Sequence, residues 1–366
     1  RNALIGVQYV ASFGLIIGAT FMYLQNYYMQ NTPLGYDKDE IIITNMNNNI
    51  RKSRDAFASQ VKSFSGIEEV TYAEMLLSSQ DQYMGWGRKY RDKDIQFQCL
   101  PVEPSFLKVM NVKISEGRDF REEDKAKRYG TFVFNERART EYGLEIGSLI
   151  DSMEIVGFMP DVKFASFRTE VTPMAFFVWG TNNWGNQPNY AYIKVKAGSD
   201  LRGAMQHVKT TLQSFDPEYP FNVRFFDEVL NGLYEKERSL SSLITLFSLI
   251  AIFISVVGVF GLVVFDSEYR KKEIGIRKVL GSTTEEIIVM FNKTYIRILC
   301  VCFVLGAPIA GYVVHRWLEN FAYKTPMYWW VYLIAFAIIA VITILTVTFQ
   351  NWRAANENPV HSIKNE

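Results

Sequence analysis

Residues 240–265 read LSSLITLFSLIAIFISVVGVFGLVVF, a run of apolar and small side chains without a single charge. A helix needs about 20 mostly apolar residues to cross the hydrocarbon core of a bilayer. Three other runs approach or meet this requirement, so the sequence predicts a helical membrane protein with four spans. We expect these spans at residues 1–25, 240–265, 298–314 and 328–350.

The first run is the least apolar of the four, because it contains Gln8, Ser12 and Thr20. A cleaved signal peptide is the alternative for this run, but no convincing small-residue cleavage site follows it. The chain opens with Arg1 in place of Met. We therefore expect a processed or truncated product, or a part of a longer protein.

The net charge, the cysteine and histidine positions and the motifs exclude some classes of function. The net charge of the 366 residues is +1, which gives no electrostatic case for nucleic-acid binding. The three cysteines, Cys99, Cys300 and Cys302, form no Cys-x-x-Cys pair, and the three histidines lie far apart in the sequence. Phosphate-loop, G-x-S-x-G and H-E-x-x-H motifs do not occur. We expect a chain that is not an enzyme and holds no metal or cofactor.

The short loops predict the orientation, because basic residues favour the cytoplasmic side. Residues 266–297 carry seven Lys or Arg, whereas residues 315–327 carry two. The first loop is thus expected in the cytoplasm with both termini, including the tail at 351–366. Residues 26–239 then form one large extracytoplasmic domain.

Two β-α-β patterns, separated by a long insertion, predict an α+β outer domain of split ferredoxin-like units. The insertion, residues 101–177, is expected to be mostly β. Two segments, RKYRDKD at 88–94 and WGTNNWGNQPNY at 179–190, are interpreted as loops; aromatic, Asn and Gln side chains in the second also suit peptide or sugar contacts. The expected strands are 41–44, 68–76, 190–195 and 221–226, and the expected helices are 53–64 and 201–215.

A stalk is expected between the outer domain and the second span. Asp227 is placed to cap a helix that has no proline before residue 240. The residues assigned to this stalk are Asp227, Leu233, Glu235 and Arg238. A rigid helix of this kind can transmit a displacement, although a merely extended helix would have the same sequence.

Small residues recur inside the spans at spacings that let helices approach closely. Packing within one chain is favoured over a dedicated dimer face. The residues of this set are Ala251, Ser255, Gly258, Gly306, Ala310 and Gly311.

The loop after the second span reads DSEYRKKEIGIRKVLGST. Gly281 is placed to end a helix, and Ser282 and Thr283, followed three residues on by Glu285 and Glu286, both offer a capping box for the next one. Ile276 and Leu280 offer apolar anchors between basic residues. A positive-inside anchor would account for the charges alone, but it would not require the ordered Gly, Ile and Leu.

The segment EIGIRKVLG resembles the cytoplasmic signature of MacB/FtsX-type ABC transporter permeases. FLKVMNVKISEGRDF, TFVFNE and IVGFMPDVKF are similar to the outer domain of that family, and NPVHSIKNE is similar to its cytoplasmic tail. The opening RNALIGVQYVASFGLIIGATF resembles the start of the second half of duplicated eight-span permeases.

The resemblance implies a permease of a bacterial inner membrane that couples a separate cytoplasmic ATPase, which would hold ATP and Mg, to motion of a periplasmic domain. Efflux of peptides, antimicrobials or lipoproteins would be the outcome. Further implied partners are a second permease half or a second copy, a periplasmic adaptor and outer-membrane channel or a hydrolase, and lipid. The implied ATPase contacts are Glu273, Ile274, Gly275, Ile276, Arg277, Lys278, Leu280 and Gly281.

Two alternatives remain open. An FtsX-like regulator would use the same rod to control a periplasmic cell-wall hydrolase. A ligand sensor would predict signalling domains at the tails.

Overall fold

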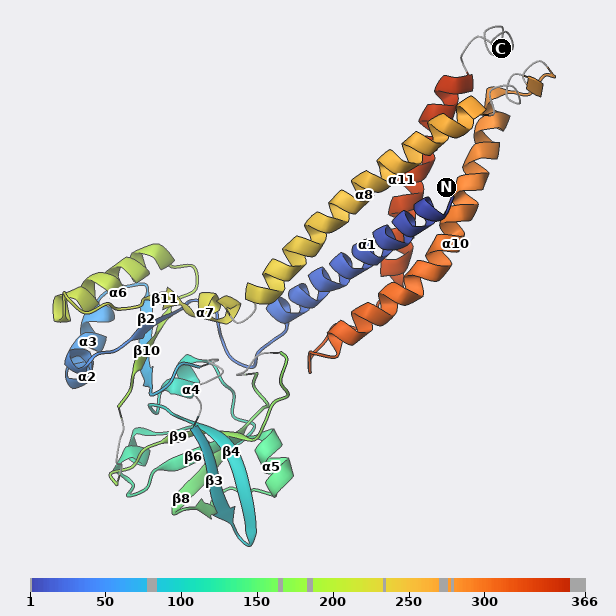
Figure 1. Ribbon diagram of the computed structural model, residues 1–366. Coiled ribbons are helices and arrows are strands. Elements are labelled where there is room, and N and C mark those ends of the chain that lie inside the picture. The colour runs from blue at the N-terminus through green and yellow to red at the C-terminus, as the bar shows by residue number, and fades with distance from the viewer. Residues whose placement is uncertain are drawn as a thin grey trace. The chain divides into compact units, whose positions relative to one another are not determined.

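The computed structural model describes residues 2–77, 84–163, 167–182, 187–232, 235–269, 276–277 and 280–355 (Figure 1). The chain divides into two compact units. One is a helical bundle made of Arg1–Asn31 and Lys236–Glu366, and the other is an α+β domain, Thr32–Glu235. This division supports the predicted class of four apolar helices with one large inserted domain.

Four long helices form the bundle unit (Figure 1). All four are long and apolar enough to cross a membrane. Two of them extend well past the predicted spans: α1 begins near the start of the chain and ends at residue 31, and α10 begins at residue 284, not 298. The helices are α1 (Asn2–Asn31), α8 (Glu235–Tyr269), α10 (Thr284–Leu318) and α11 (Trp329–Ala355).

Helices α1, α10 and α11 pack into one core. Phe13, Phe303 and Phe336 meet with ring centroids 5.1 to 6.4 Å apart. Gln25, fully buried on α1, donates from Nε2 to the Tyr323 carbonyl at 3.0 Å and accepts from the Thr325 N–H at 2.8 Å. A buried amide with both ends satisfied fixes the connection between α10 and α11 to α1.

The first sheet of the outer domain confirms the split ferredoxin-like prediction. Its strand order is β11-β1-β10-β2, and every neighbouring pair is antiparallel. The strands are β1 (Ile41–Asn45), β2 (Ile67–Ala73), β10 (Tyr190–Val195) and β11 (Arg224–Phe225); the helices are α2 (Asn48–Lys52), α3 (Arg54–Val61) and α6 (Leu201–Phe215). Strand β11 is much shorter than the predicted 221–226: residues 221–223 precede it without strand pairing, and Phe226 already begins a helix.

The second sheet is formed by the insertion and has seven strands. It begins at Met84, not at residue 101, because β3 (Met84–Tyr90) and β4 (Lys93–Pro101) form a long hairpin. The segment RKYRDKD, interpreted as a loop, is therefore the tip of that hairpin. The other strands are β5 (Glu116–Gly117), β6 (Thr131–Asn135), β7 (Leu149–Ile150), β8 (Met153–Met159) and β9 (Met174–Val178).

Asn135, at the end of β6, organises one flank of this second sheet. Its side-chain oxygen caps helix α5 (Glu136–Tyr142) by accepting from the Ala138 N–H at 3.1 Å. The same oxygen accepts from the Met174 N–H at 3.0 Å, and the amide nitrogen donates to the Thr172 carbonyl at 3.0 Å. One buried side chain thus joins the start of α5 to the start of β9. Two smaller elements of the insertion are α4 (Phe106–Val109) and a 3-10 turn, η1 (Glu122–Ala126).

Candidate functional site

The turn between α8 and α10 is the first part of the candidate site. The Leu280 N–H donates to the Ile276 carbonyl at 3.0 Å, and the Ser282 N–H donates to the Arg277 carbonyl at 2.9 Å. Gly281 has a φ of +95°, a left-handed conformation that favours glycine and commonly ends a helix. The helical segment at Ile276 therefore stops at Gly281, as its position in the sequence indicated.

Helix α10 begins immediately after this turn with a reciprocal cap. The Thr283 hydroxyl accepts from the Glu286 N–H at 3.2 Å, and the Glu286 carboxylate accepts from the Thr283 N–H at 3.1 Å. A capping box of this kind satisfies two backbone donors that the helix cannot satisfy itself. It fixes the direction in which α10 leaves the turn.

The side chains at this turn divide into exposed and packed groups. Leu280 is 79% exposed and Ile276 is 56% exposed. The Arg277 guanidinium contacts the Met290 sulfur on α10. Two large apolar side chains therefore project from a turn whose backbone is fixed on its α10 side. Four predicted contact residues lie outside the described residues: Glu273, Ile274, Gly275 and Lys278.

The small residues of the spans lie at contacts between helices of the bundle. A Cβ on Gly306 would stand 3.4 Å from the Val10 Cα on α1, and a Cβ on Gly311 would stand 2.8 Å from the Tyr332 hydroxyl on α11. A Cβ on Gly258 would stand 2.4 Å from Gln8 Oε1. Ala310 is buried, Ala251 is half-buried, and the side chain of Ser255 lies outside the described ones. Gly306, Gly311 and Gly258 thus serve packing within one chain.

Replacing Gly306 by leucine is expected to destabilise the bundle by about 1 to 3 kcal/mol, because the side chain would force α1 and α10 apart. Alanine at the same position is expected to be tolerated, because its Cβ would reach only an ordinary van der Waals distance from α1. Thermal unfolding of both variants in lipid nanodiscs measures the difference. Equal stability of the leucine and alanine variants would contradict this close packing.

Helix α8 is attached to the bundle differently from the other three. Only 6% of its apolar span is buried, against 39% for α1, 28% for α10 and 33% for α11. Its described polar contacts with α1 are few. The single hydrogen of the Ser248 hydroxyl has two acceptors within reach, the Leu15 carbonyl at 2.9 Å and the Ile244 carbonyl of its own helix at 2.7 Å. The Ser12 hydroxyl reaches the Ala251 carbonyl at 3.4 Å.

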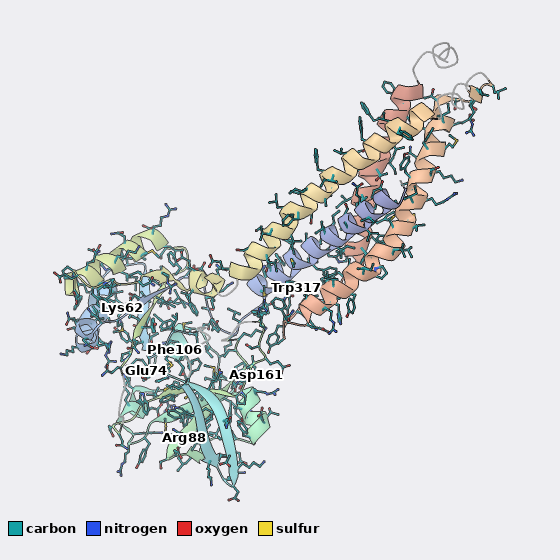
Figure 2. All side chains as sticks on the ribbon, viewed as in Figure 1. Lys62, Glu74, Arg88, Phe106, Asp161 and Trp317 are labelled. Atoms are coloured by element: carbon teal, nitrogen blue, oxygen red, sulfur yellow. The ribbon has the colours of Figure 1, made fainter. Side chains whose placement is uncertain are left out.

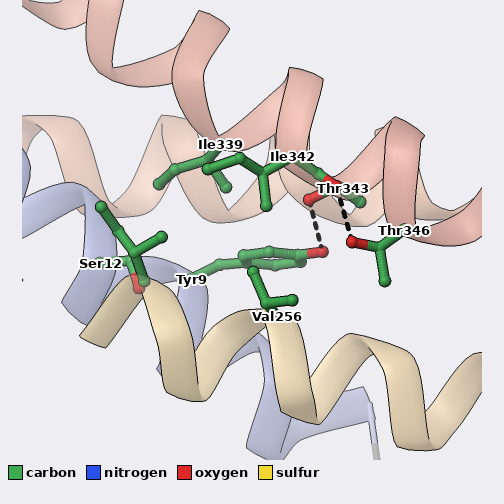
Figure 3. Close-up of a pocket in the computed structure, with 8 residues that line it drawn as sticks. Tyr9, Ser12, Val256, Ile339, Ile342, Thr343 and Thr346 are labelled. Carbon is green, nitrogen blue, oxygen red and sulfur yellow. Dashed lines mark hydrogen bonds between the residues drawn. The ribbon is translucent and has the colours of Figure 1, made fainter. Parts of the chain in front are cut away.

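A small apolar cavity lies where α1, α8 and α11 meet (Figure 3). The Tyr9 hydroxyl is hydrogen-bonded to Thr343 Oγ1 at 3.0 Å along this cavity, and Val256 closes it from α8. The space open to the centre of a water molecule is about 10 Å³, which is at the lower limit for holding one water. The sequence prediction missed these polar contacts, and the signal for them was the group of polar side chains in the first span.

The stalk residues are distributed over two helices. Helix α7 (Phe226–Gly232) begins one residue before the predicted cap, and Asp227 lies in its first turn, where the carboxylate accepts from the Glu228 N–H at 2.9 Å. Phe226 is fully buried in the outer domain beside Tyr36 and Tyr192. Glu235 is the first residue of α8. Leu233 lies outside the described residues, as does the side chain of Arg238.

The described part of the chain was predicted to hold no metal ion and carries one buried thiol in its outer domain, Cys99. No three His, Cys, Asp or Glu side chains there are placed to hold a metal ion. Burial raises the pKa of the Cys99 thiol well above its ordinary value, and its sulfur contacts the Met84 carbonyl at 3.3 Å. Cys99 therefore stays protonated and unreactive at neutral pH.

Known protein families account for most of the chain. The profile of the MacB-like periplasmic core domain matches residues 5–211, and that of the FtsX-like permease C-terminal region matches residues 245–359. The chain belongs to the MacB/FtsX-type ABC transporter permeases. It is a multi-pass membrane protein with a periplasmic-type domain, as the resemblance predicted.

The sequence identity of this chain to individual relatives is low. The macrolide export ATP-binding/permease proteins MacB of Chromobacterium violaceum and Escherichia coli K12 are each 23% identical to this chain. The match covers 60% of this chain and 35% of each relative. The periplasmic region of MacB from Actinobacillus actinomycetemcomitans covers 55% of this chain, and 95% of its own length, at 13% identity and a TM-score of 0.40. The chain thus spans about a third of the curated relatives that it matches.

Proposed function

We propose that this chain is the permease subunit of an ABC transporter in which a separate cytoplasmic ATPase docks on the turn between α8 and α10. The observation that carries the proposal is the pair of exposed apolar side chains, Ile276 and Leu280, at that turn. The backbone next to them is fixed by the left-handed Gly281 and by the capping box of α10. In an aqueous loop such anchors favour burial against a partner protein.

In the proposed role, this chain couples ATP hydrolysis by the partner to a conformational change, and the chain itself does not hydrolyse ATP. ATP and Mg would be held by the partner, and closure of its two copies would push the α8–α10 turn. Helix α8 is the proposed moving element, because its span is the least buried and its Ser248 hydroxyl has an alternative acceptor within its own helix. The three-helix core of α1, α10 and α11 would stay together, held by Gln25 and by the Tyr9–Thr343 hydrogen bond.

The stalk would carry the motion of α8 to the outer domain. Phe226 anchors α7 in the outer domain, so motion of the stalk would be passed to the ferredoxin-like sheet. We further propose that the protein resides in a bacterial inner membrane and works with a second permease half or a second copy. Efflux is the proposed outcome, with peptides, antimicrobials or lipoproteins as cargo, and with a periplasmic adaptor and an outer-membrane channel as partners. The macrolide-export names of the MacB relatives support this direction of transport.

A reversible cross-link between α8 and α1 tests this role. Cysteines replacing Ser12 and Ala251, in a chain without Cys300 and Cys302, are expected to form a disulfide, because the Ser12 hydroxyl lies 3.4 Å from the Ala251 carbonyl. Oxidation is expected to remove most of the permease-dependent ATP hydrolysis in nanodiscs, and reduction should restore it.

The matched control links α1 to α10 through cysteines replacing Val10 and Gly306, because a Cβ on Gly306 would stand 3.4 Å from the Val10 Cα within the proposed rigid core. Its oxidised form should hydrolyse ATP like the reduced form. Full activity with α8 locked to α1 would show that α8 does not move in the cycle.

A further inference from the structure

The inserted sheet carries an open groove of about 530 Å³ over the β3–β4 hairpin. This volume lies within the range of about 300 to 1,000 Å³ that is typical of small-molecule sites. The lining is without charged side chains and includes Gly85, Gly87, Gln96, Gln98, Tyr142 and Pro173. Figure 2 labels Arg88, which lies on β3 of this hairpin.

The two glycines of the groove have no backbone reason to be glycine. Gly85 pairs with Gln98 and Gly87 with Gln96 in an unbroken register, so β3 has no bulge there. Neither glycine has a positive φ, and among the described residues no atom lies within 4 Å of a Cβ placed on either. Glycine inside a strand weakens it, and one common reason for its presence is close approach of a ligand. Because the two glycines have no side chains, the surface beside the two glutamines stays accessible to a ligand.

The opposite side of the hairpin explains how β3 tolerates this weakness. Trp86 lies between the glycines and packs on Phe177 and Trp179, with centroids 4.9 and 6.1 Å away. Arg88 stacks over Trp86 at 4.4 Å and pairs with Asp151 on the turn after β7 at 2.5 Å. One face of β3 is therefore anchored by large side chains, while the groove face carries none at Gly85 and Gly87.

The polar side chains of the groove are the amides of Gln96 and Gln98 and the hydroxyl groups of Tyr142 and Thr172. Gln96 and Gln98 alternate along β4, so both lie on the exposed face of the sheet. Each amide can donate two hydrogen bonds and accept others. The backbone groups that β3 and β4 direct at each other are used in their ladder. A ligand on this face would be bound by these neutral amides, and the charged pair Lys89 and Asp94 lies beyond the lining.

The walls of the groove are held in place by the buried Asn135. This residue caps α5, whose last residue is Tyr142, and it also fixes the Thr172–Met174 segment. The Tyr142 hydroxyl donates to the Gln96 carbonyl at 2.6 Å, and the Gln98 N–H donates to the Pro173 carbonyl at 2.9 Å. The two walls are thus preorganised around the amides.

We propose that this groove binds an uncharged saccharide. Neutral amides that both donate and accept suit hydroxyl groups, and the rings of Tyr142 and Pro173 offer apolar contact to the C–H groups of a sugar. An extended peptide would be expected to add to the edge of a strand, whereas this groove lies over the face of the hairpin. The proposal concerns a ligand of the outer domain and does not depend on the coupling role.

Binding can be measured by saturation-transfer NMR on the full chain in nanodiscs prepared without glycoside detergents. The probes are maltose, cellobiose and N,N′-diacetylchitobiose, and at least one is expected to bind. Replacing Gly87 by valine should abolish that binding without lowering the unfolding temperature, because valine favours strands and no described atom lies within 4 Å of its Cβ position. Replacing Gln98 by leucine should weaken binding about 10-fold, as expected when a bound hydroxyl loses its partner.

The matched control is Lys89→Val, on the same face of the same strand but outside the lining, and it should bind like the wild type. Maltoheptaose, cellohexaose and chitohexaose, compared with the three disaccharides, distinguish a polymeric glycan, which should bind more tightly, from a free sugar, which should not. Absence of binding for all six probes would overturn the proposal. Unchanged binding by the Gly87→Val variant, or binding of tetra-alanine in place of any sugar, would also overturn it.

Discussion

Replacing Ile276 and Leu280 together by aspartate is expected to weaken binding of the ATPase by at least about 100-fold, because each buried apolar anchor contributes about 2 kcal/mol or more. Both side chains are exposed in the chain alone, so the substitutions should leave its folding unchanged. Co-purification from mildly solubilised membranes, followed by an ATPase assay in nanodiscs, measures the effect.

Leu149→Asp is the control for this experiment. Leu149 is 60% exposed, a fraction similar to the 56% of Ile276, but it lies on β7 of the outer domain. Its replacement should leave the ATPase bound and active. If the double variant retained the ATPase at wild-type level, the α8–α10 turn would be an anchor for the membrane only, and the proposed docking role would be wrong.

Replacing Asn135 by leucine is expected to lower the stability of the outer domain by about 4 kcal/mol, because each buried backbone group left unpaired costs about 1 to 3 kcal/mol. Three such groups depend on this side chain: the N–H groups of Ala138 and Met174, and the Thr172 carbonyl. Unfolding of the full chain in urea, followed by tryptophan fluorescence, gives the change.

Two further variants serve as comparisons for the leucine variant. Asn135→Asp keeps both acceptor contacts but sets a carboxylate oxygen against the Thr172 carbonyl, so it should destabilise the domain less at acidic pH, where the protonated carboxyl group can donate to that carbonyl, than at neutral pH. Asn49→Leu removes an exposed amide that contacts Asp216 at 3.0 Å, and it should change stability by less than about 1 kcal/mol. Equal stability of the leucine variant and the wild type would show that Asn135 does not organise this flank.

The sequence predicted the large features of the fold because each has a periodic signal. Apolar runs of membrane length indicated the four helices, and two β-α-β patterns indicated the sheet with order β11-β1-β10-β2. The start of the inserted sheet was missed for a physical reason. Gly85 and Gly87 replace the alternating side chains that mark a strand, and the basic residues at the hairpin tip suggest a loop.

The candidate site was predictable where its geometry is local. Gly281, Thr283 and Glu286 lie within six residues, and their types alone specify a helix end followed by a capping box. Contacts between distant segments gave no such signal. Gln25 meets the segment at Thr325, about 300 residues away in the sequence, and only the packed bundle brings them together.

In the proposed mechanism, α8 moves against a rigid core of α1, α10 and α11 when the ATPase cycles. The most direct measurement is the distance between spin labels at Val257 on α8 and Val341 on α11, both exposed, in nanodiscs with the ATPase bound. A second pair, at Val7 on α1 and Val341, serves as the reference. The first distance is expected to change between the nucleotide-free and ATP-trapped states, while the reference distance is expected to stay the same. An α8–α11 distance that stays constant while ATP is hydrolysed would contradict this mechanism.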